Sequence, residues 1–312
     1  MNHILNKLIP LTTPFAVALG FLFPVFFGVF RPYIPWLFGL MTFTGALKLK
    51  ASELGASVKN PLPIAAFFIT SHIFMPLTAL FITSLFFTNH DIITGYVLLF
   101  AGPTAVSGFI WIMIYKGDKA LGLSLILLST ILAPLIVPAT IRILMGKIVV
   151  MDMSGIALSL LLMIVVPTIL GVAINETSKG KVPHIISASL DPFSKICLIL
   201  VIAANTSAVA HNIKFNDPVV WMVILFCIVL TTIGFLFAKL NSIIVKCNDE
   251  KSTSLILSGG LRNNSAVMTI AVAFFPEMTV LPTLMSIITQ QSIAALIGKL
   301  LIKKKLSSKL VP

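Results

Sequence analysis

Charged residues are scarce in this sequence of 312 residues. Asp, Glu, Lys and Arg together make up 10% of it, whereas hydrophobic residues make up 58%. Soluble proteins cover their surfaces with polar and charged side chains, so this composition excludes a water-soluble fold. The apolar runs are continuous and do not alternate with polar residues, which excludes a transmembrane β-barrel. The composition therefore predicts an all-α membrane protein.

Acidic residues are the scarcer kind of charge. The chain has 10 Asp and Glu against 22 Lys and Arg, for a net charge of +12. A basic excess is also typical of nucleic-acid-binding proteins, but the rule that loops rich in Lys and Arg stay on the cytoplasmic side explains it here. Lys303, Lys304 and Lys305 follow the last apolar segment, where they favour contact with anionic lipid. We therefore expect a lipid bilayer as partner and no nucleic acid.

Cysteines and catalytic motifs are also few. Cys197, Cys227 and Cys247 form no spaced motif, which argues against a disulfide framework and a zinc site. The apolar segments contain no pair of carboxylates, and the sequence has no His-Glu metal cluster and no Gly-x-Ser-x-Gly elbow. We expect no enzyme activity, no bound metal and no cofactor.

Polar and proline-containing breaks divide the chain into ten apolar segments, which predict ten transmembrane helices in one integral-membrane domain, residues 1–312. Of the 22 Lys and Arg, 17 fall on the N-terminal side of the membrane in this arrangement. This bias predicts that both termini are cytoplasmic and that the protein lies in the plasma or inner membrane. The segments are approximately residues 11–30, 34–47, 61–87, 92–114, 119–145, 153–174, 193–211, 218–240, 254–275 and 279–301.

The ninth segment has a polar centre. Ser258-Gly259-Gly260 and Arg262-Asn263-Asn264-Ser265 interrupt the apolar residues 255–275. A buried arginine costs about 3 kcal/mol or more in a membrane span, and two glycines weaken a helix. One interpretation is a cytoplasmic loop between two helices, but neither apolar piece is long enough to span alone. We favour a discontinuous helix that forms a binding site near the membrane midplane.

The chain also contains a weak internal repeat. The fourth segment has its own break over residues 102–108, and Pro103 precedes Ser258 by 155 residues, about half the chain. A division near residue 152 gives halves of approximately 1–150 and 151–312. Five helices in each half require the second half to be inverted. Paired broken helices in inverted halves indicate a secondary transporter with its site where helices 4 and 9 cross.

With these features in place, the sequence resembles the bile acid:sodium symporter family over nearly its whole length. The matching stretches include Pro-Tyr-Ile-Pro-Trp-Leu at 32–37, Phe74-Met75-Pro76, residues 102–118, residues 121–130 and residues 260–266. The resemblance implies ten helices in inverted repeats, a panel domain, a core domain, and crossing helices 4 and 9. It also implies transport of bile acids or other organic anions, usually with sodium.

The positions that hold sodium in this family differ here. The family's Ser-Asn pair of the first crossover falls on Gly108 and Phe109, and the helix-five hydroxyls fall on Gly122 and Ile126. The family's Glu and Gln of the second crossover fall on Ser258 and Arg262, and its helix-three Gln falls on Ser71. Every acidic residue lies in a loop or at a segment end. We therefore expect Arg262, a fixed cation, to stand in for sodium.

The remaining polar residues of the spans are candidates for substrate binding. The resemblance places Asn263 at a substrate contact, whereas Asn264 and Ser265 either bind substrate or cap the second half-helix. His72 is either a buried histidine bonded to a neighbouring helix or a coupling group. Ser129 and Thr130 are expected to bond to carbonyls of their own helix. The predicted substrate-binding residues are Arg262, Asn263, Asn264, Ser265, Thr104, Ser107, Gln290 and Gln291.

The sequence thus predicts a secondary transporter of an organic anion, either bile-acid-like or a small carboxylate or sulfonate. Two alternatives stay open. The first is an ordinary sodium:organic anion symporter, which the resemblance implies. The second is a membrane receptor that binds the anion without moving it, although a receptor has no need of two equivalent half-site helices.

Overall fold

The computed structural model of the chain describes residues 13–47, 49, 61–146, 152–211, 213–214 and 216–303. Within these residues the secondary structure is helical, apart from one isolated β-bridge. Six helices are long and apolar enough to cross a membrane: Pro24–Ala46, Leu62–Phe86, Lys119–Met145, Met153–Thr177, Pro218–Ile244 and Glu277–Ile302. Shorter apolar helices are Thr13–Leu22, His90–Ala101, Pro192–Ser207 and Asn264–Phe274.

Side chains from the loops cap the N-termini of several of these helices. Asn89 accepts a hydrogen bond of 2.8 Å from Asp91 N at the start of α7 (His90–Ala101). Asp118 accepts from Leu121 N at the start of α9 (Lys119–Met145), and Asp217 accepts from Val219 N at the start of α13 (Pro218–Ile244). Capping satisfies amide groups that have no partner inside a helix. Several of the scarce acidic residues therefore serve the ends of helices, outside the apolar interior.

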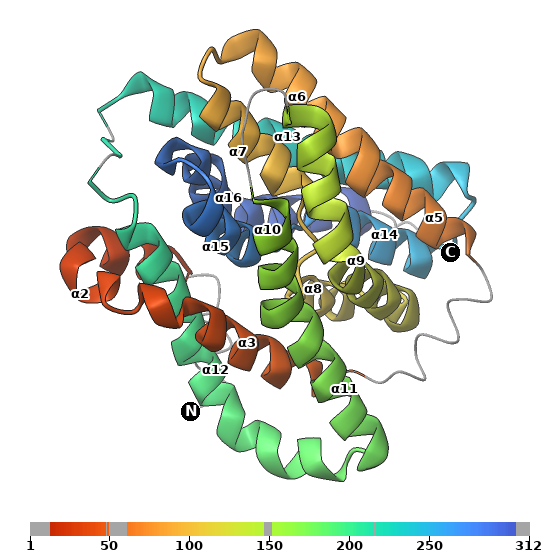
Figure 1. The fold of residues 1–312 in the computed structure, drawn as a ribbon. Coiled ribbons are helices and arrows are strands. Elements are labelled where there is room, and N and C mark those ends of the chain that lie inside the picture. The colour runs from red at the N-terminus through yellow and green to blue at the C-terminus, as the bar shows by residue number, and fades with distance from the viewer. Residues whose placement is uncertain are drawn as a thin grey trace.

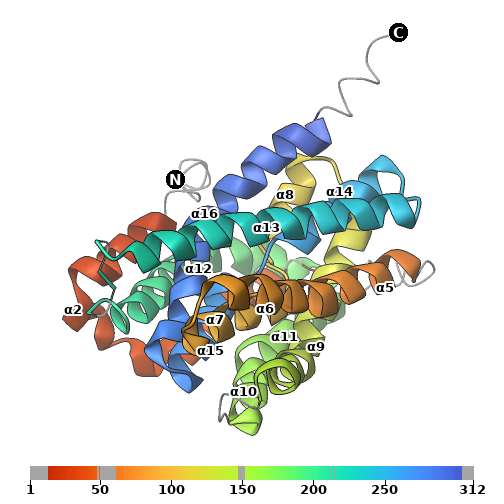
Figure 2. The same ribbon diagram turned by 90° about the horizontal axis from the view of Figure 1, so that it is seen from above.

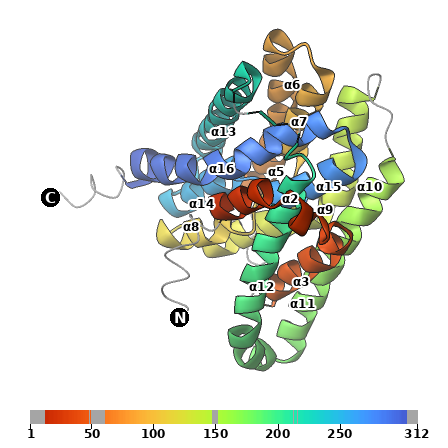
Figure 3. The same ribbon diagram turned by 90° about the vertical axis from the view of Figure 1, so that its left-hand side faces the viewer.

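The helices form two groups that meet along a seam (Figure 1). The panel group consists of α2 (Pro24–Gly28), η1 (Arg31–Tyr33), α3 (Ile34–Ala46), η3 (Leu161–Val165), α11 (Val166–Thr177) and α12 (Lys181–Ser207). α10 (Met153–Leu160) leads into η3 and contacts α9 and α15 (Asn264–Phe274) of the other group. Within the panel group, α3 packs against both α11 and α12. Figure 3 shows α3, α11 and α12 together on one side, with α6 (Met75–Phe86), α7 and α13 on the other.

The core group carries both interrupted helices. Besides α6, α7, α9 and α13, it contains α5 (Leu62–Ile69), η2 (Thr70–Phe74), α8 (Gly108–Ile114), α14 (Asp249–Gly260), α15 (Asn264–Phe274), η4 (Glu277–Thr279), α16 (Val280–Ile297) and η5 (Gly298–Lys303). In Figure 2, α13 runs across the molecule between α16 and α6, and it contacts both.

The predicted fourth and ninth segments are each two helices. α7 ends at Ala101 and α8 begins at Gly108, whereas α14 ends at Gly260 and α15 begins at Asn264. The glycines of the ninth segment form the last turn of α14 and not the break itself. A Cβ atom on Gly260 would lie 2.2 Å from the Phe235 ring, and one on Gly259 would lie 2.5 Å from Ala238 Cβ. These glycines allow close packing of α14 on α13.

The structure differs from the predicted boundaries at the seventh segment. The seventh segment was expected to begin near residue 193, yet α12 begins at Lys181. Gly180 has φ of +78°, which lets the chain reverse directly between α11 and α12. A polar composition excludes a segment from the apolar bilayer, but it does not prevent a helix outside it. The first 12 residues and most of the 48–60 loop lie outside the described residues, so the predicted placement of the termini stays a prediction.

Candidate functional site

The two helix breaks meet at the centre of the core group. Thr104 and Arg262 form an antiparallel β-bridge. Ala105 N donates to Leu261 O at 3.1 Å, and Asn263 N donates to Pro103 O at 2.9 Å. Extended backbone inside a membrane protein needs such partners, because no water is available there. The two breaks therefore satisfy each other and form one unit, here called the crossover (residues 102–107 and 261–263).

Side chains around the crossover fix it further. The Thr104 hydroxyl is buried and lies 2.5 Å from Ser258 O and 2.8 Å from Leu261 O. Gln290 on α16 makes two bonds to one residue: its Oε1 accepts from Arg262 N at 3.0 Å, and its Nε2 donates to Arg262 O at 2.9 Å. Both Thr104 and Gln290 were predicted to bind substrate, and in the structure their polar atoms are engaged by backbone.

Arg262 is 2% exposed, and its guanidinium contacts main-chain carbonyls. Nη2 donates to Ser71 O at 3.0 Å, and Nη1 lies 3.5 Å from Gly102 O. Nε has no partner within the described residues, and no carboxylate there accepts from the side chain. The positive charge is thus held by the negative ends of peptide dipoles, the kind of environment that also suits a metal cation.

His72 lies close to this cation. Its Nε2 is 3.2 Å from Ser129 Oγ, and its ring stacks on Phe68 with 5.2 Å between centroids. Ser129 Oγ also accepts from Thr104 N at 3.0 Å. The expectation that Ser129 bonds to its own helix is therefore wrong, because the crossover needs an acceptor for the Thr104 amide. Ser129 links His72 to the first break.

The positions aligned with the family's sodium ligands offer few side-chain oxygens. Ser71 contributes its carbonyl, which already accepts from Arg262, and the buried Ser258 hydroxyl has no partner in the part of the chain that the structure describes. Gly122 has no side chain, and a Cβ atom there would lie 2.5 Å from Ile112 Cδ1, so the end of the Ile112 side chain would have to move. The other aligned positions carry no oxygen in their side chains: Gly108 begins α8, Phe109 packs beside Leu123 and Leu127, and Ile126 is buried.

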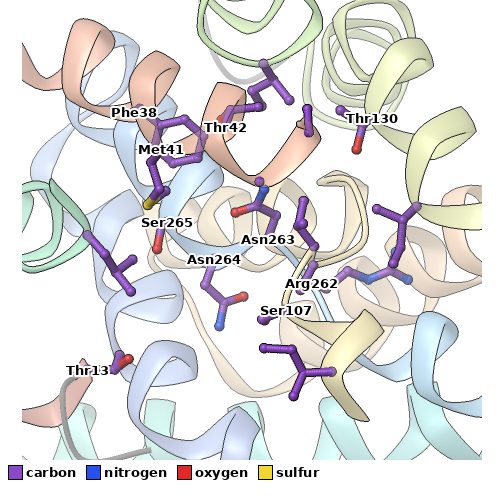
Figure 4. Close-up of a pocket in the computed structure, with 18 of the residues that line it drawn as sticks. Thr13, Phe38, Met41, Thr42, Ser107, Thr130, Arg262, Asn263, Asn264 and Ser265 are labelled. Carbon is purple, nitrogen blue, oxygen red and sulfur yellow. The ribbon is translucent and has the colours of Figure 1, made fainter. Parts of the chain in front are cut away.

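A cavity of about 370 Å³, here called cavity 1, lies beside the crossover on the seam between the panel and core groups. Asn263, Asn264 and Ser265 line it from the start of α15, and Ser107 lines it from the first break (Figure 4). Apolar side chains of the panel group face them, among them Phe38 and Met41. Figure 4 shows the Arg262 side chain extending away from Asn264 and Ser265.

Several polar atoms at cavity 1 have definite partners. Asn263 caps α15 by accepting from Ala266 N at 3.3 Å. Asn264 Nδ2 donates to Ser286 Oγ at 3.0 Å, which leaves its buried Oδ1 without a partner within the described residues. Gln291 Oε1 accepts from Trp111 Nε1 at 2.9 Å. Sequence reasoning missed Trp111, although an aromatic residue just after the first break is a signal that could have pointed to the cavity.

The structure thus divides the predicted residues into two sets. Ser107, Asn263, Asn264, Ser265 and Gln291 present side chains at cavity 1. The side chains of Thr104, Arg262 and Gln290 lie within the crossover or behind it, although Arg262 and Gln290 also border the cavity.

Comparisons with known proteins identify the family of this chain. A family model described as the sodium bile acid symporter family matches residues 35–216. This chain belongs to that family. It is 38% identical over 295 residues to a Bacillus subtilis (strain 168) protein named "Uncharacterized protein YbaS", which covers 94% of this chain and 96% of the relative.

Two further relatives of this chain carry transport in their names. One is the B. subtilis (strain 168) "Uncharacterized sodium-dependent transporter YocS", 24% identical over 269 residues, or 86% of this chain and 82% of the relative. The other is the rice (Oryza sativa subsp. japonica) "Probable sodium/metabolite cotransporter BASS3, chloroplastic", 22% identical over 258 residues, or 82% of this chain and 60% of the relative. The description of the family and the names of these two relatives point to transporters and not to enzymes.

Proposed function

We propose that this protein is a secondary transporter of an organic anion, which binds in cavity 1 and crosses the membrane by alternating access. Its ten membrane segments form two inverted halves, and both termini are cytoplasmic. The observation that carries the proposal is a buried, permanently charged Arg262 at the point where two interrupted helices meet. Interrupted helices at membrane depth typically build transport sites.

The charge and dipoles around cavity 1 support an anionic substrate. No Asp or Glu lines the cavity within the described residues, whereas Arg262 borders it. α15 has 11 residues and begins at the cavity, so its positive end faces the substrate. Asn263 and Ser265 would bind the anionic group, and Ser107 and Gln291 would contact the rest of the molecule. The guanidinium acts from behind this site, through its field.

The substrate also has an apolar part. Phe38, Met41 and Ile202 line the panel side of cavity 1, where they would contact a hydrocarbon body. Bile-acid-like anions and small carboxylates or sulfonates with an apolar chain fit this description. A fully hydrated inorganic anion would leave these side chains in contact with water.

The guanidinium replaces a sodium ion in this proposal. Arg262 and Ser71 occupy positions aligned with sodium ligands, and the guanidinium contacts Ser71 O at 3.0 Å. Repulsion between two unit charges at 4 Å is about 4 kcal/mol at an effective dielectric near 20. Such repulsion would weaken sodium binding roughly a thousandfold. Transport would then be a uniport, an exchange or a proton-linked process, with His72 as the candidate coupling group.

Ordinary sodium symport is the second candidate, because YocS and BASS3 carry sodium in their names. Backbone carbonyls at broken helices bind sodium in some transporters. The two candidates share a substrate site and differ in whether sodium strengthens anion binding.

The test of the function is counterflow in sealed vesicles. A thermal-shift screen of the purified protein against organic anions first identifies a ligand. Vesicles that contain the protein and are preloaded with this anion are then diluted into a trace of the labelled anion. We expect transient accumulation of label, absent from protein-free vesicles. Binding without counterflow would favour the receptor alternative, and a screen in which cations outperform every anion would contradict an anionic substrate.

A further inference from the structure

A second cavity lies on the same seam between the panel and core groups. This cavity 2 has a volume of about 410 Å³ and is lined by Arg31 and Pro35 near the start of α3, by Asn205 and Val209 near the end of α12, and by Thr269 and Glu277 on the core side. It shares no lining residue with cavity 1.

The two cavities lie one after the other along the same helices. On α3, cavity 1 begins at Phe38 and cavity 2 ends at Pro35. On α12, the neighbouring lining residues of the two cavities are Ile202 and Asn205. On α15 they are Ser265 and Thr269. One helical turn is 5.4 Å, so about one turn of each helix separates cavity 1 from cavity 2.

A hydrogen bond crosses the seam in this separating layer. Asn205 Nδ2 on α12 donates to Thr269 Oγ1 on α15 at 2.9 Å. Thr269 Oγ1 in turn donates to Ser265 O at 2.9 Å. Asn205 is fully buried. A chain of two hydrogen bonds therefore joins the panel group to Ser265, the residue of α15 that lines cavity 1 nearest to cavity 2.

The carbonyl oxygen of the Asn205 side-chain amide takes no part in this chain of hydrogen bonds. Its Oδ1 is buried and has no partner within the described residues. A buried acceptor without a partner is unfavourable, and an apolar side chain of similar size would fill the same space without that cost. The polar residue is therefore better suited to a second arrangement, in which the layer opens and the amide reaches water or substrate.

We propose that Asn205 and Thr269 form a latch between the two cavities. The latch rests on the proposed function, since it acts in alternating access. While the bond is made, the panel and core groups stay together and cavity 2 is cut off from the substrate site. When the groups separate, cavity 2 joins cavity 1, and the Asn205 amide and Thr269 hydroxyl line the passage as hydrogen-bond donors to the anion.

The latch is tested by a distance measurement that needs no substrate. Spin labels are placed at Ala208 on the panel side and Ala273 on the core side of cavity 2, in a background where the three native cysteines are replaced. Thr269→Val keeps the shape of the side chain and removes the hydroxyl. We expect the ratio of the long-distance to the short-distance population to rise about tenfold, which corresponds to 1.4 kcal/mol and lies within the range of one hydrogen bond.

Two control variants are matched to this change. Thr269→Ser keeps the hydroxyl, and Thr206→Val removes a buried hydroxyl that donates to Ile202 O of its own helix. Both should give the unmodified distance distribution, whereas Asn205→Leu should shift it in the same direction as Thr269→Val. The latch is overturned if Thr269→Val leaves the distribution unchanged, or if Thr206→Val shifts it equally. A protein that shows the shift but no counterflow would refute the proposed transport and leave the latch intact.

Discussion

Main-chain carbonyls hold the charge of Arg262. Its guanidinium donates to Ser71 O and lies near Gly102 O, and no carboxylate of the described residues neutralises it. A buried cation without a counter-ion is unfavourable, so its presence here points to a ligand that completes the site. In our proposal, the substrate anion in cavity 1 is the missing counter-charge.

Replacement of this side chain should therefore act on transport more than on folding. For Arg262→Gln we expect anion uptake to fall about tenfold or more, because the variant removes the only fixed positive charge that borders cavity 1 within the described residues. Uptake into vesicles is compared with that of Arg142→Gln, which removes an exposed arginine in the last turn of α9 and should leave uptake unchanged. Equal uptake by both variants would contradict the assignment.

The sequence predicted Arg262 in the membrane but not the direction of its side chain. An arginine between glycines and asparagines in an apolar run indicates a polar site, because few other arrangements tolerate it. Its side chain is long enough to reach either the cavity or the carbonyls behind it. The choice depends on where α5 and η2 place Ser71 O, which is 191 residues away in sequence.

The two breaks of the crossover depend on a side chain from a third element, α16. α7 ends at Ala101, directly before the predicted break at residues 102–108, and α14 ends at Gly260, within the polar centre of the ninth segment. The partner of the second break was not predictable, because Gln290 is 28 residues away and belongs to α16. Long-range pairing of a side chain with backbone leaves no periodic signal in the sequence.

Gln290 should therefore contribute to stability more than its neighbour Gln291. Gln290→Leu leaves Arg262 N and Arg262 O without these partners in a buried site, at a cost of about 1–3 kcal/mol for each group. Gln291→Leu removes one acceptor from the partly buried Trp111, so its cost should be about 1 kcal/mol or less. Thermal unfolding in detergent compares the two variants. Similar midpoints for both would show that the pairing does not hold the crossover in place.

At the scale of the whole molecule, composition was enough to predict a helical membrane protein, and the six long apolar helices agree with it. The family resemblance implied a panel and a core domain but not which helices form each, because packing partners far apart in sequence, such as α3 with α11 and α12, have no local pattern. The inverted relation between the halves stays a prediction. The sequence did not predict a helix in the polar segment before residue 193, although α12 begins at Lys181.

Coupling is a property of the whole molecule, because it links an ion site to the movement of the panel and core groups. If the guanidinium of Arg262 serves as a built-in cation, anion binding should be insensitive to sodium. We expect affinities within about twofold in sodium chloride, potassium chloride and choline chloride at matched ionic strength, since charge screening is then equal in all three. Isothermal titration with the anion from the thermal-shift screen measures them. The affinity in potassium chloride shows any general effect of small cations. The affinity in choline chloride is the reference without a small metal cation. A gain of tenfold or more that is specific to sodium corresponds to about 1.4 kcal/mol of coupling free energy, and it would establish ordinary symport in place of the arginine-based mechanism.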